Sequence, residues 1–395
     1  MKINLAGPTA VVVAPVEQNG WGWYQFPTIE RLPNGVLLIQ YQLWPDTQDS
    51  QGTPRGKVLS TDGGQTWRPV ENVPSYHPYH NAWAAALELP NGDMLAAITL
   101  PAQKVTDLKL PKPVGQDQSS YKFTRQWYLV DSLSADLKDW HFVRWQKHQQ
   151  SWLKESAEVC IPGAVRFASV QEGVLRHPHM DRMKLAPDGS IWGIRYDKRF
   201  VDGQLQDKVH VMILRSTDLG RSWDLYSEIP YQGDFQVDPD WVKQEGFSEP
   251  DVAFMPDGSV FCLMRTTYGL GPAPLYWARS TDAGKTWSLP KVFDDVGVWP
   301  QLVTLPCGVT LAAYGRPGLY LRATAEPSGQ SWQPRITIIE PGEYHKDTCS
   351  YSAMMALDAT TALLVYSDFR HLANDGKIHK AIMVRKVTVY PAPGD

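Results

Sequence analysis

Short apolar runs separated by tight turns dominate the hydrophobic pattern of this chain. Residues 36–40, 94–98 and 259–264 are such runs, and each follows closely on a Pro-Asn-Gly or Pro-Asp-Gly turn. An apolar run that leaves a turn of this kind is typical of a β-hairpin. None of these segments shows a helical period of useful length, so the pattern predicts an all-β fold.

The turns recur along the whole chain. Most copies read as an apolar residue, Pro, a polar residue and Gly, and the last copy is degenerate. A turn repeated in this way indicates a repeat architecture, with each copy between the first two strands of one unit. The copies lie at residues 32–35, 89–92, 186–189, 255–258, 305–308 and 357–360.

A second, longer turn motif interleaves with the first. It reads Ser-Thr-Asp-x-Gly-x-Ser/Thr-Trp at residues 60–67, 216–223 and 280–287, with decayed copies at 134–140 and 326–332. The Asp can accept hydrogen bonds from the turn's own N–H groups, and the Gly supplies a positive φ. The Trp can fill the space between neighbouring sheets. The motif therefore predicts a hairpin turn at each copy.

The alternation of the two turns predicts the architecture. One turn between strands one and two, and another between strands three and four, describes a four-stranded antiparallel blade. Six such units predict a six-bladed β-propeller that forms a single domain over residues 1–395. We expect residues 9–14 to form a strand that closes the last blade beside residues 381–389. Two long insertions, at residues 101–122 and 146–175, are expected over the mouth of a central site.

Composition narrows the classes of function. The net charge of −4 and the lack of a basic run argue against nucleic acid and membranes as partners. No apolar stretch is long enough to span a bilayer. The first residues lack the apolar region of a secretory signal, so the protein is expected to be cytoplasmic, or secreted with its signal removed. The 4 cysteines form no metal-ligand pair, so neither a metal nor a cofactor is predicted. Nothing in the sequence indicates an oligomeric state.

The repeat register also predicts a site at the axis of the propeller. The innermost strand of each blade begins nine or ten residues before its turn residue, and these starting positions converge. Two indoles, a phenol, a carboxylate, an imidazole and an amide suit a saccharide pocket, because aromatic faces cover a sugar ring and polar groups orient it. The six positions are Gln25, Trp83, His179, Glu249, Trp299 and Tyr351.

The longer turn motif resembles the Asp-box of the sialidase superfamily, and two further motifs extend the resemblance. Glu249 opens a strand, a Pro-Asp-Gly turn follows, and Arg265 stands sixteen residues after the Glu, as in sialidases. Tyr351, in a Tyr-Ser pair, matches the sialidase nucleophile. The resemblance implies that Glu249 takes the proton of Tyr351, since a phenol with an ordinary pKa of about 10 is otherwise a poor nucleophile. It also implies that Arg265 binds the substrate.

Two departures from the sialidase pattern bear on the substrate. Sialidases begin with Tyr-Arg-Ile-Pro, whose Arg helps to hold the substrate carboxylate, whereas Gln25 stands at the Arg position here. Ser367 replaces the Glu that orients this Arg. Loss of both partners leaves neither group unpaired, and an amide is a poor substitute for a bidentate guanidinium. We therefore expect a sugar other than ordinary sialic acid.

The resemblance implies two further site residues. The third sialidase Arg falls at Arg316, with Arg322 as a competitor. The sialidase acid/base Asp belongs to the loop that precedes the first copy of the longer turn. Asp46 and Asp49 are the acidic residues of that loop, and Asp46 is preferred.

Histidines where two of the inner strands begin have no counterpart in the sialidase pattern. His177 and His179 flank Pro178, so an extended backbone points both to one side, and His80 precedes another inner strand. They are interpreted as hydrogen-bond donors to sugar hydroxyls, as the base of a polysaccharide lyase, or as residues that shape the loops. A metal site of two His and one Asp is another alternative, but spacing places no third ligand.

These features predict an exo-acting, retaining glycoside hydrolase that acts on a non-reducing-end acidic or polyhydroxylated sugar of an oligosaccharide or glycoconjugate. Tyr351, Glu249 and Asp46 are the predicted catalytic residues. The predicted substrate-binding residues are Arg265, Arg316, Gln25, Trp83, His179, Trp299, His177 and His80.

Other functions stay open on the sequence alone, because fold does not choose between them. They are a uronate-polysaccharide lyase or rhamnosidase-like enzyme that works through His, a true sialidase, and a non-catalytic glycan-binding propeller. A further variant is an exo-arabinanase-like enzyme in which Glu172 and Glu249 are the catalytic pair.

Overall fold

Strands carry the fold of the described residues. The computed structural model describes the chain except for residues 48–49, 51–52, 72, 74–84, 179, 267–270 and 391–395. In this part of the chain, no helix has the length and apolar character needed to cross a bilayer. The prediction of an all-β fold is confirmed. The helices are α1 (Ala135–Lys138) and 3-10 turns at Val105–Asp107, Val130–Ser132 and Trp241–Lys243.

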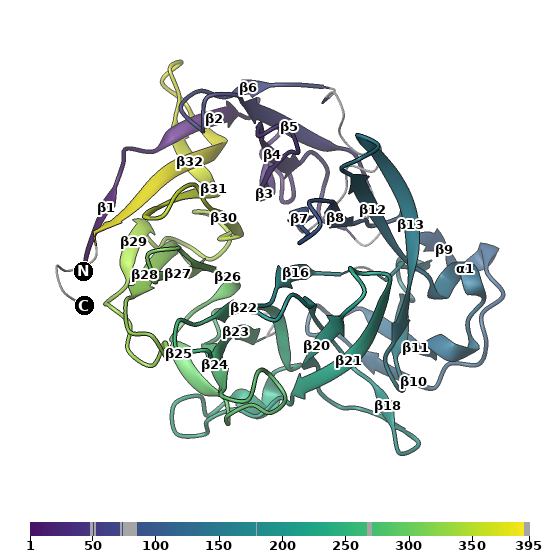
Figure 1. The fold of residues 1–395 in the computed structure, drawn as a ribbon. Coiled ribbons are helices and arrows are strands. Elements are labelled where there is room, and N and C mark those ends of the chain that lie inside the picture. The colour runs from purple at the N-terminus through teal and green to yellow at the C-terminus, as the bar shows by residue number, and fades with distance from the viewer. Residues whose placement is uncertain are drawn as a thin grey trace.

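The sheets follow one another around a ring (Figure 1). Within the described residues, three sheets have four antiparallel strands each, and every pairing joins strands that are consecutive in sequence. This meander is what two alternating turns produce. The first sheet contains β3 (Gln25–Arg31), β4 (Leu37–Gln42), β5 (Arg55–Ser60) and β6 (Arg68–Pro69). The others contain β22 (Phe247–Phe254), β23 (Val260–Thr266), β24 (Leu275–Ser280) and β25 (Lys291–Asp294), and β26 (Val298–Thr304), β27 (Thr310–Gly315), β28 (Leu319–Thr324) and β29 (Ile336–Ile339).

A larger sheet contains two antiparallel runs that the repeat pattern treats as separate units. Its order is β16-β17-β20-β21-β13-β12-β8-β7. The runs join where β13 lies parallel to β21, with Glu158 opposite Ser222. The strands are β7 (Leu87–Glu88), β8 (Met94–Ala97), β12 (Trp140–Gln146), β13 (Ser151–Cys160), β16 (Arg182–Leu185), β17 (Ile191–Asp197), β20 (His210–Ser216) and β21 (Ser222–Ile229); a ribbon of β18 (Phe200–Val201) and β19 (Gln204–Leu205) follows β17.

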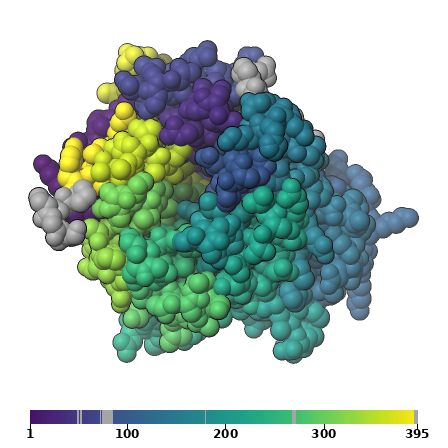
Figure 2. All heavy atoms as spheres, in the orientation of Figure 1, coloured from purple at the N-terminus to yellow at the C-terminus, as the bar shows by residue number. Residues whose placement is uncertain are grey.

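The two ends of the chain meet in one sheet. The strand expected at residues 9–14 is β2 (Thr9–Val13), which pairs with β32 (Ile378–Tyr390). β1 (Lys2–Leu5) pairs with the far end of β32. The purple N-terminal atoms accordingly lie against the yellow C-terminal atoms in Figure 2. The sheet is completed by β31 (Thr361–Leu372) and β30 (Ser352–Ala356).

A five-stranded inserted sheet stands outside the ring, beside α1 (Figure 1). Part of the insertion predicted at residues 146–175 was assigned wrongly, because β13 is a ring strand that pairs with β12 and β21. The inserted sheet has the order β10-β11-β14-β15-β9. Its strands are β9 (Gln103–Lys104), β10 (Gly115–Gln118), β11 (Thr124–Leu129), β14 (Val165–Ser169) and β15 (Val174–Leu175).

The longer turn motif forms the predicted hydrogen bonds at its three full copies. In the second copy, Asp218 Oδ1 accepts hydrogen bonds from Arg221 N and Ser222 N at 3.0 Å each, and from Ser216 Oγ at 2.8 Å, and Gly220 N donates to Ser216 Oγ at 2.8 Å. Gly220 has a φ of 87°. Trp223 is buried and stacks on Phe142 of β12. The same pattern of Ser, Asp and Gly bonds holds at residues 60–67 and 280–287.

The two decayed copies behave differently. Glu326 takes the Asp position in the last copy and accepts hydrogen bonds from Ser328 N and Gln330 N, so this turn is kept. The hairpin turn predicted at residues 134–140 is wrong, because α1 occupies the segment. The copy has Leu137 near the place of the Gly, so no residue supplies the positive φ, and Leu137 instead forms the buried face of the short helix α1.

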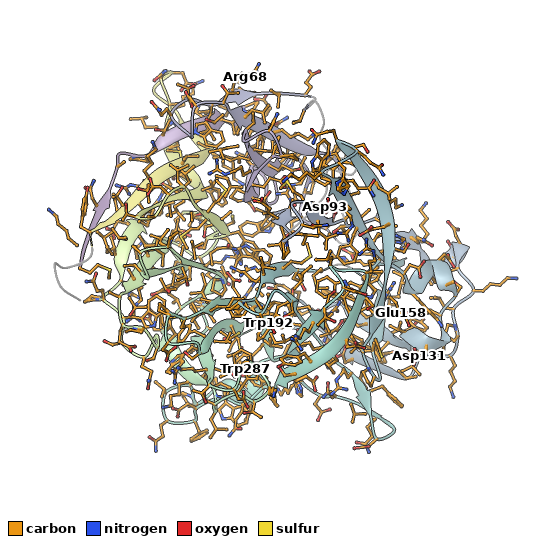
Figure 3. The ribbon with its side chains drawn as sticks, in the orientation of Figure 1. Arg68, Asp93, Asp131, Glu158, Trp192 and Trp287 are labelled. Atoms are coloured by element: carbon orange, nitrogen blue, oxygen red, sulfur yellow. The ribbon has the colours of Figure 1, made fainter. Side chains whose placement is uncertain are left out.

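The apolar core lies between neighbouring sheets rather than at the centre of the ring. One cluster joins β17 and β20 to β22, β23 and β24, and Trp192 lies within it. Trp287, from the third full copy of the longer turn, packs against the same cluster, and Figure 3 labels both indoles. A Cβ on Gly284 would approach Trp192 to 2.1 Å, so Gly is required there for close packing.

Candidate active site

A cavity of about 380 Å³ collects most of the described site residues. Its wall comes partly from the ring and partly from the inserted sheet. Residues of the predicted insertions thus supply part of the cavity wall. The predicted residues in the wall are Asp46, His177, Glu249, Arg265, Trp299 and Tyr351.

Glu249 lies at a bulge near the start of β22. The register shifts between Ser248 and Asp251, and Glu249 has a φ of 49°. Its side chain is buried. Arg265 Nη1 donates to Glu249 Oε1 at 2.7 Å, and Trp299 N donates to Oε2 at 2.9 Å. Both carboxylate oxygens are therefore held in place from two different sheets.

Tyr351 immediately precedes β30 and meets the same carboxylate. Its hydroxyl donates to Glu249 Oε1 in a short hydrogen bond, and Arg265 Nη1 lies 3.3 Å from the phenol oxygen. The Tyr351 ring stacks on Trp299 at 4.9 Å and meets Phe26 edge-on at 4.8 Å. Two aromatic contacts and two polar contacts fix the position of the hydroxyl.

Burial raises the pKa of Tyr351 well above its ordinary value, and the charge of Glu249 adds to this effect. The positive charges of Arg265 and Arg316 act in the opposite direction. The phenol is therefore held protonated. Reaction at the oxygen requires the proton to move as the new bond forms, and Glu249 is the base in contact with it.

Asp46 reaches the cavity from the loop after β4. Trp21 Nε1 donates to Asp46 Oδ2 at 3.1 Å. The side chain is exposed, yet the protein packed around it removes enough water to raise the pKa of its carboxyl. The hydrogen bond from Trp21 and the charges of Arg176 and Arg316 partly offset this rise. Asp49, the other acidic residue of this loop, lies outside the described residues.

The structure does not place Gln25 in the cavity wall. Gln25 is fully buried, and its Oε1 accepts a hydrogen bond from Gly22 N at 3.1 Å. Phe26 faces the cavity from this strand instead. Phe26 stands nine residues before Gly35, the same count that leads from Glu249 to its turn Gly, whereas Gln25 follows from a count of ten.

Ser367, at the position of the sialidase Glu, is also buried away from the cavity. Its backbone carbonyl accepts a hydrogen bond from Thr348 Oγ1, and its hydroxyl lies 2.9 Å from Cys349 Sγ. Neither Gln25 nor Ser367 provides a charged group to the cavity.

Arg316 is close to Tyr351 but is held by the backbone. Its Nη2 and Nε donate to the carbonyl of Cys349 at 2.7 Å and 3.2 Å. The guanidinium carbon lies 5.4 Å from the Tyr351 ring centre and 5.1 Å from that of Trp21. The competitor Arg322 instead donates to backbone carbonyls of Gln333 and Phe293. Arg316 is thus the better positioned of the two.

His177 is a buried histidine in the cavity wall. Gln103 Nε2 lies 2.9 Å from His177 Nε2, and because the amide nitrogen donates, Nε2 accepts and Nδ1 carries the proton. Nδ1 has no hydrogen-bond partner among the described residues. Burial lowers the pKa of His177 to about 4, so the imidazole is neutral at pH 7. His179, His80 and Trp83 lie outside the described residues.

The cavity also contains polar residues that sequence reasoning missed. Tyr121, from the inserted sheet, accepts a hydrogen bond from Arg265 Nη2 at 3.2 Å. Arg166 and Arg176 belong to the wall as well. Their positions in and beside an insertion carried no register signal. Glu172, the partner in the arabinanase-like alternative, is exposed and does not belong to the cavity wall.

The sequence matches two family models that describe the same kind of repeat. A BNR repeat-like domain matches residues 126–363, and a BNR/Asp-box repeat matches residues 58–69. A search of curated proteins finds no match.

Solved structures resemble this fold along almost the whole chain. A protein of unknown function from Dyadobacter fermentans has a TM-score of 0.67 and 18% identity, with 98% of this chain and 99% of that chain covered. The Hadza microbial sialidase Hz136 has a TM-score of 0.56 and 15% identity, with 97% and 68% covered. An α-L-arabinanase of Penicillium chrysogenum, in complex with arabinobiose, has a TM-score of 0.52 and 15% identity, with 96% and 98% covered. At these identities the likeness shows the fold alone.

Proposed function

The chain belongs to the family defined by the BNR repeat-like domain and has a sialidase-like fold, and from this premise we propose that it is an exo-acting, retaining glycoside hydrolase. The observation that carries the proposal is the hydrogen bond between Tyr351 and Glu249, closed by Arg265. A phenol, its base and a cation are the parts that a tyrosine nucleophile requires. The proposal includes a single propeller domain of six four-stranded blades, with β13 and β21 as the joint between two blades.

In the first half of the reaction, Tyr351 Oη forms a bond to the anomeric carbon while the glycosidic C–O bond breaks. The phenol proton passes to Glu249 Oε1. Asp46 delivers its proton to the leaving oxygen, which departs as an alcohol. The positive charge that develops on the sugar is offset by the negative charge shared by Tyr351 and Glu249, which is neutralised as the bond to Oη forms. The product of this half is an aryl glycoside, in which the anomeric carbon is bonded to Tyr351 Oη.

In the second half, Asp46 acts as the base. It takes a proton from a water molecule, whose oxygen attacks the anomeric carbon. The bond to Tyr351 breaks, and the phenolate recovers its proton from Glu249. Two displacements at one carbon restore the original anomeric configuration, so the enzyme retains it.

The substrate proposed is an acidic or polyhydroxylated sugar at the non-reducing end of an oligosaccharide or glycoconjugate, rather than ordinary sialic acid. Trp299 and Phe26 offer aromatic walls, and Arg265 and Arg316 lie beside the reacting phenol. Gln25 does not provide a substitute for the carboxylate-binding Arg of sialidases, because it faces Gly22.

The Tyr351→Phe variant tests the proposal. Mass spectrometry of oligosaccharides incubated with the wild-type protein identifies the substrate from a panel of sialosides, uronate-containing fragments, rhamnosides and arabinans. On that substrate we expect Tyr351→Phe to lower kcat/KM by roughly a thousandfold or more, because the covalent route is lost. Tyr226→Phe is the matched control, since its hydroxyl only donates to the carbonyl of Ala283 at the surface. Activity of Tyr351→Phe near the wild-type rate would refute the nucleophile.

A lyase is the second candidate, and the position of His177 favours it. The neutral imidazole lies in the cavity wall, and Nε2, the nitrogen without a proton, would act as the base in place of its contact with Gln103. The mass-spectrometric panel separates the two candidates, since hydrolysis products sum to the substrate plus one water. Products that sum to the substrate mass, with an unsaturated uronate, indicate elimination and replace the hydrolase proposal.

A further inference from the structure

The inserted sheet contributes one side of the cavity wall. Trp127 lies on β11, and Arg166 and Phe167 lie on the neighbouring strand β14. Arg176 follows β15 directly and completes this side. The part of the wall that comes from the ring includes Tyr351, Glu249 and Arg265. A bound oligosaccharide therefore meets two distinct surfaces.

Arg166 has an unusual environment for an arginine. Arg166 is only 8% exposed to solvent. Nε and Nη2 have no hydrogen-bond partner among the described residues. Nη1 makes a long contact of 3.4 Å with the backbone carbonyl of Arg176. A guanidinium carries five N–H donors, so most of the donors of Arg166 are unused.

Four of the six other buried arginines in the described chain bind carboxylates at distances of 2.5–3.2 Å, and the remaining two, Arg55 and Arg316, donate to backbone carbonyls. Arg166 and Arg176 form no such ion pair within the described residues. The paired examples are Arg125 with Asp117, Arg144 with Glu155, Arg182 with Asp251, and Arg265 with Glu249.

Nearby charges do not compensate Arg166. Burial and the positive charge of Arg195 lower the pKa of Arg166 to about 9. Asp197 and Asp139 act in the opposite direction without outweighing this effect, and the carboxylate of Asp197 already accepts hydrogen bonds from Arg195 at 2.6 Å and from Lys198 N at 2.8 Å. An uncompensated buried charge is strongly unfavourable. A bound anion would remove this imbalance.

Arg176 places a second cation in the same wall. Its Nε has no partner among the described residues, and burial lowers the pKa of its guanidinium. The charge of Asp46 favours its protonated form. Arg176 thus links the unpaired Arg166 to the side of the cavity that holds the proposed acid/base.

We propose that Arg166 and Arg176 form an anion subsite that binds a carboxylate or sulfate group carried by the sugar substrate. Guanidinium groups bind such oxyanions through paired, charge-assisted hydrogen bonds. The identification of the anion as part of a sugar rests on the proposed function. The subsite itself rests on the two arginines, neither of which belongs to the sialidase pattern.

The test measures binding without turnover. In the Tyr351→Phe background, tryptophan fluorescence follows titrations with glucuronate, inorganic sulfate and neutral glucose at constant ionic strength. We expect glucuronate or sulfate, but not glucose, to bind. Arg166→Gln and Arg176→Gln should each weaken that binding by about tenfold or more, the effect of one lost charge-assisted contact. Preference for glucuronate indicates a uronate substrate, and preference for sulfate indicates a sulfated one.

Thermal unfolding is a second measurement, and it distinguishes anion binding by Arg166 from a purely structural role of this residue. Without anion, Arg166→Gln should be as stable as its parent or more stable, because an uncompensated buried charge is removed. At the same anion concentration, the parent should gain more stability than Arg166→Gln does. Arg31→Gln, at an exposed position on β3, is the control and should match the parent in both measurements.

Three results overturn the subsite: no binding of either anion, equal binding in the parent and in both variants, or loss of binding only when Arg265 is replaced. None of these results depends on hydrolysis. A protein that hydrolyses nothing but loses anion binding in Arg166→Gln retains the subsite. A hydrolase with unchanged anion binding in that variant retains only the proposed function.

Discussion

Three inner strands present their site residues through the same backbone device. Phe26, Glu249 and Trp299 have φ values of 52°, 49° and 44°, and each is followed by Pro. The register of each strand shifts at this point. A positive φ is unfavourable for these residue types, so the surrounding sheets must hold it. The kink points one side chain per strand into the cavity. The residue at that position then decides which chemical group the strand contributes.

Asp46 gives a prediction that separates the proton donor from the nucleophile. Asp46→Asn should lower the rate on substrates with poor leaving groups by roughly a hundred- to ten-thousandfold, the usual range for general acid catalysis. Substrates with an acidic phenol as leaving group need no protonation and should lose far less. Kinetics on a matched pair of alkyl and aryl glycosides provide the measurement. Equal losses on both substrates would show that Asp46 is not the acid.

The pH dependence of the wild-type activity should also show that Asp46 acts as the acid. The acid acts in its protonated form, so activity on alkyl glycosides should fall as pH rises through the pKa of Asp46. Because burial raises this pKa, the fall should come at a higher pH than for an exposed Asp. In the Asp46→Asn variant, this fall in activity with rising pH should be absent.

The site residues could be predicted only where the position along the strand was known to the single residue. Glu249, Arg265 and Tyr351 were selected by fixed spacings, and they lie together. The choice of Gln25 failed because a shift of one residue moves a side chain to the other face of a strand. No spacing could select Arg166, whose position depends on how an inserted sheet packs against the ring.

Among the elements, the longer turns bind one sheet to the next through Gly and Trp. Gly220 has a φ of 87°, and a Cβ there would approach Leu95 Cδ2 to 2.4 Å. Gly220→Ala should therefore lower the free energy of unfolding by about 2–4 kcal/mol, the sum of a backbone term and an overpacking term. Urea denaturation followed by tryptophan fluorescence measures the difference.

Gly189→Ala is the matched control for this prediction. Gly189 has a φ of 81°, but a Cβ there meets nothing within 4 Å. It should show the backbone term alone, about 1–2 kcal/mol. If both variants lose the same stability, the contact with Leu95 contributes nothing and the packing role of the turn is wrong.

Element prediction succeeded where a turn had its full chemistry. The copies with both Asp and Gly fold as predicted, whereas the segment with Leu137 becomes α1 because it lacks a residue suited to positive φ. β13 forms a hairpin with β12, but it was assigned to an insertion because its other partner, β21, lies far from it in sequence and belongs to another repeat. Local patterns contain no information about such pairings.

At the scale of the whole molecule, the cavity exists because the inserted sheet is fixed against the ring. Asp117 on β10 accepts hydrogen bonds from Arg125 at 2.7 Å and 2.9 Å and from Lys198 of the ring at 2.6 Å. Arg125 also donates to Glu245, which precedes β22. The same sheet brings Tyr121 to Arg265. Docking of the insertion is thus coupled to the position of a proposed catalytic contact.

Asp117→Asn should loosen this docking and so affect both stability and binding. Burial acts to raise the pKa of Asp117, but hydrogen bonds from Arg125, Lys198 and Trp127 outweigh it and lower the pKa. A lowered folded-state pKa means that the stabilisation is complete above the unfolded pKa of about 3.9 and is lost as pH falls through the folded-state value. At pH 7 the variant should lose about 2 kcal/mol of unfolding free energy, and the difference from wild type should shrink below about pH 4.

In the same variant, KM should rise more than kcat falls, because the cavity wall moves while the contact between Tyr351 and Glu249 is unchanged. Asp188→Asn, which removes an exposed pair with Arg215, should change stability by less than about 1 kcal/mol and leave KM unaltered. A loss at pH 7 that persists unchanged at pH 3 would mean that the charge of Asp117 does not hold the inserted sheet.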